Sequence, residues 1–166
     1  LTPSQTAEQA SALRAEQAAL SEMLTRAETF ATINALGDAD ADAAQVSRLF
    51  DKAIIGVYFA HPELLGYVTA RSLDHVLATG MTPEAGLAFA WWSMILCMQD
   101  QHVLATSYAR LACESYGRFG NGYYGGAATM VATAMALSWT RSYDANVADA
   151  ASSFELLHQS GNAQFA

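Results

Sequence analysis

The chain has 166 residues, 52% of them hydrophobic and only 14% charged, and it carries a formal net charge of −8. This length favours one domain, and the negative charge argues against nucleic acid or an anionic membrane surface as a partner of this segment. No stretch is long and apolar enough to predict a membrane-spanning helix, so we expect a cytoplasmic location.

The apolar content and the two ends of the chain indicate a piece of a larger protein. The chain begins at Leu1 rather than at a methionine, and it stops at Phe165-Ala166 without a polar tail. Cys97 and Cys113 fall sixteen residues apart on separate expected helices. We therefore expect two buried, reduced thiols rather than a disulfide or a metal-binding pair.

The first predicted element is a long helix from Ser4 to about Asn34. Thr2-Pro3 places a capping residue before a proline, and the stretch that follows is rich in Ala, Gln, Glu and Leu, which favour helix. An acidic linker, residues 37–42, comes next, and its aspartates can cap a second helix. That helix is expected from about Ala43 to Phe59, where apolar residues recur at spacings of three and four.

Five further helices are predicted, most of them with a polar or proline-containing start and a glycine at the end. They run from His61-Pro62 to Gly80, from Thr82-Pro83 to about Met98, from the turn at Gln101 to near Gly120, from about Ala127 to Thr140, and from Ser142 to Gly161. The glycines between Gly122 and Gly126 predict a loose start to the sixth helix. Since no apolar–polar alternation indicates strands, the expected class is all-α.

The glycines that end alternate helices are regularly spaced, at 40 residues from Gly80 to Gly120 and 41 from Gly120 to Gly161. When they are aligned, small residues coincide eight positions earlier (Ser72, Ala112, Ser153) and eleven positions earlier (Thr69, Ala109, Ala150). Small residues at fixed points let neighbouring helices approach closely, as a helical repeat requires. We expect a tetratricopeptide-like solenoid of about three helix pairs over residues 43–166. It would follow an N-terminal helix (1–36) and the linker (37–42).

Several segments carry a resemblance to a known family. They are Phe59-Ala-His-Pro-Glu-Leu-Leu65, Ser72-Leu73, Thr79-Gly80, Thr82-Pro83-Glu84, Leu87-Ala-Phe-Ala-Trp91-Trp92-Ser-Met-Ile-Leu96, Asp100, Ala109-Arg-Leu-Ala112, Trp139 and the tail Gly161–Ala166. This pattern resembles the tetratricopeptide-like region that follows the ATPase module in large bacterial signalling proteins, including MalT-like regulators and ATPase–kinase hybrids. Tyr123-Tyr-Gly-Gly126 departs from the pattern, which has a more polar, basic helix start there. The resemblance implies a non-catalytic regulatory arm, and it places no catalytic residue on this chain.

Motifs for catalysis, cofactors or metals are not found in the sequence. The glycine-rich stretch from Gly117 to Gly126 has neither the lysine nor the preceding strand of a phosphate-binding loop. Asp38, Asp40 and Asp42 imitate a calcium loop, but Ala43 and Leu49 stand where that loop needs glycine and glutamate. No histidine has a partner at metal-binding spacing. We expect no enzyme activity, no cofactor and no metal in this segment.

The aromatic residues of the middle and later helices remain as candidates for a binding surface. Most should fill the core, but Trp91 and Trp92 are consecutive and cannot both face the same side of a helix. We take Tyr58, Trp92, Tyr123 and Tyr124 as the candidate surface for a partner peptide or helix.

Three functions remain open on the sequence. The first is a protein-interaction and regulatory arm, and the second is a domain that senses a small effector in a pocket with a few polar groups. A stand-alone helical enzyme is the third, and no motif supports it. The Ala-rich N-terminal helix could also cap the array or pair with a second copy, which leaves a homodimer open.

Overall fold

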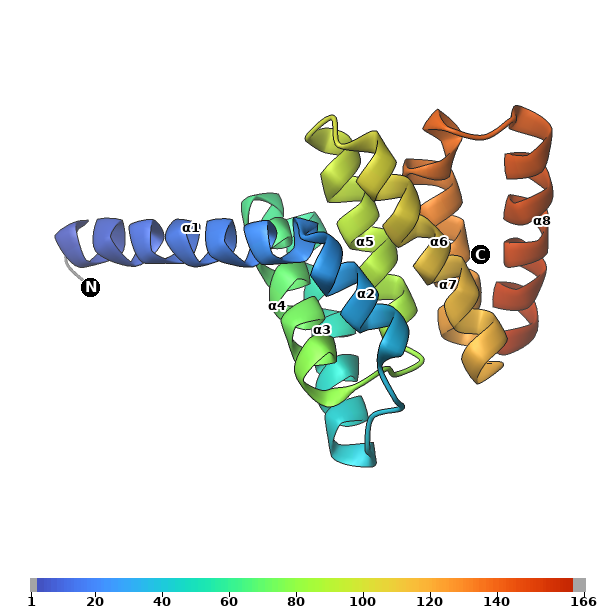
Figure 1. Ribbon diagram of the computed structural model, residues 1–166, viewed down its shortest axis with the longest axis horizontal. Coiled ribbons are helices and arrows are strands. Elements are labelled where there is room, and N and C mark those ends of the chain that lie inside the picture. The colour runs from blue at the N-terminus through green and yellow to red at the C-terminus, as the bar shows by residue number, and fades with distance from the viewer. Residues whose placement is uncertain (1–2, 163–166) are drawn as a thin grey trace.

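The computed structural model describes residues 3–162, with side chains from Glu8 onward. These residues form eight α-helices and two short 3-10 helices (Figure 1). Their bounds are α1 Pro3–Thr25, α2 Ala27–Ala35, α3 Ala41–Ala60, η1 Pro62–Leu64, α4 Leu65–Thr79, α5 Ala85–Met98, α6 His102–Phe119, α7 Gly122–Met135, η2 Leu137–Trp139 and α8 Tyr143–Ser160. The all-α prediction is confirmed for this part of the chain, where one isolated bridge, between Asp38 and Met81, is the sole strand-like pairing.

The single N-terminal helix that the sequence predicts is divided at Arg26. That residue has an extended backbone, with φ −76° and ψ 139°, and separates α1 from α2. The Thr29 hydroxyl donates to the Met23 carbonyl oxygen at 2.7 Å. This bond takes the place of the backbone amide that would donate to the Met23 carbonyl in an uninterrupted helix. Side-chain hydrogen bonds of threonine to nearby carbonyls compete with regular helix in this way. The break lets α2 turn across the other helices while the first turns of α1 extend away from them (Figure 1).

Helices α3 to α6 begin and end close to the predicted positions. The Asp40 carboxylate accepts a hydrogen bond from the Ala43 amide at 2.8 Å, so the acidic linker does cap α3. Gly80 ends α4 with φ 109°, and a side chain there would meet the Gly37 carbonyl oxygen at 2.9 Å. This glycine is required both by its backbone conformation and by the close passage of the linker.

Helix α7 begins at Gly122, so the prediction of a loose segment from Gly122 to Gly126 is wrong. The Asn121 side chain caps the helix by accepting from the amides of Tyr123 and Tyr124. A Cβ at Gly125 would lie 2.6 Å from Cβ of Tyr116 on α6. These glycines therefore allow close helix packing rather than flexibility. The helix also ends earlier than expected, at Met135, and η2 follows it.

The three aligned glycines all have positive φ values and end α4, α6 and α8. Eight positions before them, Ser72, Ala112 and Ser153 are each at most 4% exposed, as the alignment predicts. Of the residues eleven positions before, Thr69 and Ala109 are fully buried and Ala150 is partly buried. The small residues therefore lie at helix contacts.

Helices that are consecutive in the chain pack side by side from α3 to α8, and α5 also packs against α7 and, less extensively, α3. The central helix α5 is thus enclosed, and twelve consecutive residues, Ala85–Leu96, are buried. A single hydrophobic cluster includes residues from α1 and α2 (Leu24 and Ile33) as well as from the later helices. Among the described helices none is both long and apolar enough to cross a membrane.

The α1–α2 segment crosses α4 and reaches α6. Helix α1 packs against α4, and the Tyr108 hydroxyl of α6 donates to the Leu24 carbonyl oxygen at 2.6 Å. The ring of Phe30 on α2 meets the Tyr108 ring edge-on at 5.6 Å. This N-terminal segment therefore fills the space between the alternate helices α4 and α6, which we call the first hollow.

Candidate functional site

An apolar groove of about 530 Å³ lies where the C-terminal halves of α3, α5 and α7 meet η1 and η2. We call it the α3–α5–α7 groove. Its lining is Tyr58, Pro62, Leu65, Met94, Cys97, Met98, Ala134, Met135, Ser138 and Trp139. The Met98 side chain is 77% exposed and that of Trp139 70% exposed, although both are large and apolar. Contiguous exposed apolar side chains of this kind mark binding surfaces in soluble proteins.

Tyr58 is the candidate residue that the structure places in this groove. Its ring centre lies 5.0 Å from those of both Phe59 and Trp91, so the ring is fixed by aromatic neighbours. Phe59 is itself 78% exposed. The groove therefore combines a fixed aromatic wall with flexible methionine side chains, which can adapt to the shape of a bound partner.

Trp92 lies in the core, because its side chain is only 1% exposed. The sequence argument that one of the two tryptophans must face outward assumed that α5 has a free side. The structure removes that assumption, since α5 is enclosed by the neighbouring helices and Trp91 is also buried. Neither indole N–H has a hydrogen-bond partner in the described residues. Trp92 therefore cannot contact a partner from this position.

Tyr123 and Tyr124 lie together at the start of α7, with ring centres 5.0 Å apart. They do not line the groove. The ammonium group of Lys52 on α3 lies 5.7 Å from the centre of the Tyr123 ring, a cation–π contact across the two helices. Burial raises the pKa of Tyr124 to about 12, and the nearby carboxylates of Glu84 and Asp51 add to this shift. The tyrosine pair thus belongs to a charged cluster that joins α3, α5 and α7.

Two buried carboxylates form the centre of this cluster. Asp51 is 5% and Glu84 3% exposed. Glu84 accepts a hydrogen bond from Arg48 Nε at 3.0 Å, and Lys52 Nζ lies 3.1 Å from Asp51 Oδ2 without the geometry of a hydrogen bond. Burial raises the pKa of the Asp51 carboxyl, and Lys52 offsets part of that shift.

The cavity beside Asp51 and Glu84 is too small for a substrate. Its volume is about 10 Å³, which is room for roughly one water molecule. The structure brings Asp51 toward Glu84, which is 33 residues away in the chain. This arrangement can hold helices in register, but it offers no site for general acid–base chemistry on a bound molecule.

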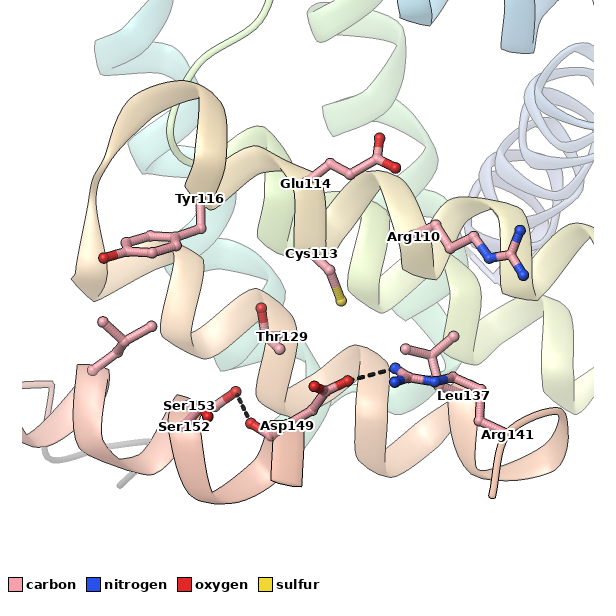
Figure 2. A pocket seen from close by; sticks show the side chains of 11 residues that line it. Arg110, Cys113, Glu114, Tyr116, Thr129, Leu137, Arg141, Asp149, Ser152 and Ser153 are labelled. Carbon is pink, nitrogen blue, oxygen red and sulfur yellow. Dashed lines mark hydrogen bonds and ion pairs between the residues drawn. The ribbon is translucent and has the colours of Figure 1, made fainter. Parts of the chain in front are cut away.

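Another hollow, of about 560 Å³, lies between α6, α7 and α8 and is open to solvent (Figure 2). We call it the second hollow. Its lining is Arg110, Cys113, Glu114, Tyr116, Thr129, Leu137, Arg141, Asp149, Ser152, Ser153 and Leu156. Arg141 Nη1 donates to Asp149 Oδ2 at 2.5 Å, and the Ser153 hydroxyl donates to the Asp149 carbonyl oxygen at 2.7 Å. Sequence reasoning missed this site, because its residues come from three separate helices and form no motif.

The Cys113 thiol points into the second hollow between Thr129 and the Arg141–Asp149 pair (Figure 2). Burial raises the pKa of this thiol, which keeps it protonated and a poor nucleophile at neutral pH. Cys97 lines the α3–α5–α7 groove, and burial raises the pKa of its thiol as well. Both cysteines are free and half-buried, so the expectation of reduced thiols holds and that of full burial does not.

The residues from 3 to 162 contain no cluster of three or more side chains that could hold a metal ion. No family model, curated protein or solved structure matches the chain. The functional argument therefore rests on the two surfaces just described, the apolar α3–α5–α7 groove and the polar second hollow.

Proposed function

We propose that the chain is a non-catalytic protein-interaction module whose α3–α5–α7 groove binds an amphipathic helix of a partner protein or neighbouring domain. The observation that carries this proposal is the exposure of Met98 and Trp139 at the rim of an apolar groove. Amphipathic helices bind grooves of this kind through apolar residues spaced three and four apart. Exposed methionine and aromatic side chains supply adaptable and rigid contact area respectively.

The charge around the groove favours a partner helix with basic flanking residues. Glu63 and Asp100 lie near the ends of the helices that form the groove and are exposed, and the whole chain carries a net charge of −8. Such a field raises the association rate of a positively charged partner. The occupant we propose is therefore an amphipathic helix with apolar anchors on one face and Lys or Arg on the other.

We further propose that the pairs α3/α4, α5/α6 and α7/α8 are units of a tetratricopeptide-like array. The alternate glycine-ended helices and the buried small residues at matching positions support this arrangement. The packing of α5 against α7 agrees with it, because first helices of successive units contact each other in such arrays. The wider role, a cytoplasmic regulatory arm of a bacterial signalling ATPase, rests on the sequence resemblance alone.

A binding measurement with a designed peptide tests the groove. The probe is a fluorescent 18-residue Leu/Lys peptide of helical periodicity, and the reference is the same composition in scrambled order. We expect the ordered peptide to bind more tightly, and Met98→Asp to weaken its binding by about tenfold or more through loss of an apolar contact. Val103→Asp adds the same charge at an equally exposed position outside the groove, so it should leave binding unchanged.

Two outcomes would contradict the groove proposal. One is equal affinity for the ordered and scrambled peptides, which would indicate charge attraction alone. The other is an equal effect of Met98→Asp and Val103→Asp. Both variants add a negative charge. A loss of peptide binding in Met98→Asp alone therefore cannot be explained by charge.

The alternative function, sensing of a small effector, is favoured by the second hollow. This hollow is within the range of ligand pockets, roughly 300–1,000 Å³, and it contains convergent polar side chains on an apolar base. The two functions use different faces of the protein and are compatible.

A further inference from the structure

The second hollow corresponds to the first hollow one repeat earlier. When the glycines that end α4, α6 and α8 are aligned, each residue of α6 or α8 that lines the second hollow has a counterpart 40 or 41 residues earlier. On α6, Arg110, Cys113 and Tyr116 correspond to Ala70, Leu73 and Val76 of α4. On α8, Asp149, Ser152 and Ser153 correspond to Tyr108, Leu111 and Ala112 of α6. All six counterparts are at most 9% exposed.

The two hollows differ in what covers them. The first hollow is apolar, and the α1–α2 segment of the same chain fills it through Leu24, Phe30 and Ile33. No described segment covers the second hollow, which stays open to solvent. Arginine, aspartate and serine replace the apolar residues there. A second apolar helix would bury Arg110 and Ser152 without the partners that Asp149 and Ser153 have, at a cost of about 1–3 kcal/mol each.

One arginine of the second hollow, Arg110, has no described carboxylate as its partner. Five of the seven arginines form an ion pair with a described carboxylate, namely Arg26, Arg48, Arg71, Arg118 and Arg141. Arg110 forms none within residues 8–162 and carries five N–H donors. The hydroxyl groups of Thr129 and Ser152 can each donate one hydrogen bond to a ligand or accept one from it. Asp149 is already neutralised by Arg141, and the Glu114 carboxylate turns away from Cys113 and Thr129 (Figure 2).

We propose that the second hollow binds a small organic carboxylate. The ligand's carboxylate accepts from the Arg110 guanidinium, whose planar fork suits two parallel hydrogen bonds. Arg110 and Arg141 lie toward one end of the hollow and Tyr116 toward the other (Figure 2). The ligand's apolar body therefore extends along the base that Leu137 and Leu156 form, toward the Tyr116 ring.

This inference gives the effector-sensing alternative its ligand class, and it does not depend on the α3–α5–α7 groove. A ligand here touches α6, α7 and α8 together. Helix α8 packs on α7 but has no extensive contact with α6, so the ligand would join two helices that the protein alone leaves apart. Binding is therefore expected to stabilise α8 against local opening.

The test uses benzoate as the probe and benzamide as its neutral counterpart of nearly equal shape, with the full chain in calorimetric titration. Succinate and inorganic phosphate form separate arms that distinguish an aromatic carboxylate, an aliphatic dicarboxylate and a phosphate. We expect saturable binding of at least one of the two carboxylates, and none of benzamide. Arg110→Gln should weaken binding about tenfold to a hundredfold, the range of a charge-assisted hydrogen bond.

Matched variants separate a site from general charge effects. Arg110→Lys keeps the charge but loses the fork, so we expect an intermediate affinity. Arg14→Gln removes an equally exposed arginine on α1 and should change nothing, and Met98→Asp in the groove should also leave carboxylate binding intact. The proposal is overturned if neither carboxylate binds, if benzamide binds as well as benzoate, if phosphate alone binds, or if Arg110→Gln binds like the unaltered chain. Failure of the peptide measurement would leave this result unaffected, so the two proposals fail separately.

Discussion

The first and second hollows lie at matching positions of the glycine alignment but have opposite surfaces. Leu73 and Val76 on α4 are buried in the hydrophobic core, whereas their counterparts Cys113 and Tyr116 on α6 face an open space. On the other side of each hollow, the buried Tyr108 corresponds to the charged Asp149. A few substitutions at matching positions are therefore enough to change a helix-binding surface into a polar one.

The difference teaches how an array of similar helices can hold a site without any sequence motif. In the first hollow, apolar side chains favour burial of a helix from the same chain, and about 25 cal/mol is gained for each Å² of apolar surface removed from water. In the second, charged and hydroxyl groups make such burial costly. Apolar side chains therefore favour packing in the first hollow, and polar side chains leave the second hollow open to solvent.

The largest expected effect is that of Tyr108→Ala, which removes a fully buried ring from the first hollow. The substitution leaves a cavity beside Phe30 and deprives the Leu24 carbonyl of its donor. We expect a loss of about 3–5 kcal/mol in the free energy of unfolding, measured by urea denaturation. Tyr116→Ala in the second hollow removes a half-exposed ring and should cost roughly 1 kcal/mol. Equal losses would contradict the contrast between the two hollows.

A glycine pair tests the close packing of α7 against α6 beside the second hollow. A methyl group at Gly125 would lie 2.6 Å from Cβ of Tyr116, so Gly125→Ala should destabilise the protein by about 1–3 kcal/mol. At Gly117, also helical, nothing lies within 4 Å of the new methyl group. Gly117→Ala should therefore stabilise the helix by up to about 1 kcal/mol. Thermal unfolding of both variants shows whether each substitution raises or lowers the stability. Destabilisation by Gly117→Ala would refute this account of the two glycines.

The buried carboxylate of Asp51 should make stability depend on pH. Its pKa is raised in the folded state because burial disfavours the charged form. Its contribution is therefore most favourable below the ordinary carboxyl pKa of about 4 and is lost as the pH rises through the raised value.

Asp51→Asn removes this charge, so we expect a melting temperature about 2–4 °C higher than that of the unaltered chain at pH 7. The gain should be much smaller at about pH 3, below the ordinary carboxyl pKa, where the carboxyl group is mostly protonated in both states. Glu155→Gln, at an exposed position on α8, is the control and should show no such difference. A lower melting temperature for Asp51→Asn at pH 7 would indicate that the ion pair with Lys52 outweighs burial.

The smallest effect is expected at the tether between the linker and α6. Arg118 donates to Asp38 Oδ1 and to the Leu36 carbonyl oxygen, which holds the end of α2 against the first hollow. Asp38 is exposed and the pair is screened by solvent. A double-mutant cycle of Arg118→Ala and Asp38→Ala should give a coupling energy below about 1 kcal/mol. A larger value, or one unaffected by salt, would mean that the tether is more than a surface ion pair.

The sequence predicted most helix ends because capping residues and glycines act locally. Asp40 and Ser142 accept hydrogen bonds from the first turns of α3 and α8, and Gly120 and Gly161 have the left-handed backbone of helix ends. The break at Arg26 was missed because no glycine or proline marks it. The start of α7 was misjudged because Gly125 and Gly126 serve contacts with Tyr116 on α6 and Leu157 on α8, which the local sequence does not show.

The candidate sites were harder to predict than the helices. Tyr58 was chosen as one of the aromatic residues expected at a binding surface, and it does line the α3–α5–α7 groove. Trp92 was misplaced because the sequence does not show how many neighbours enclose α5. Arg110 was not predicted as a site residue, since the second hollow that it lines also needs residues from α7 and α8. The glycine alignment is the signal that could have drawn attention to Arg110, because it places this charged residue at the position of the buried Ala70.

Hydrogen exchange of the unaltered chain tests most directly whether α2 fills the first hollow. A nine-residue helix is unstable by itself, so its amides can be protected only by packing on the rest of the protein, such as that of Phe30 on Tyr108 of α6. We predict that amides of Phe30–Ala35 exchange at least about a hundredfold more slowly than those in the first half of α1, which extends away from the other helices (Figure 1). Equal exchange rates in these two segments would contradict the contrast between a filled and an open hollow.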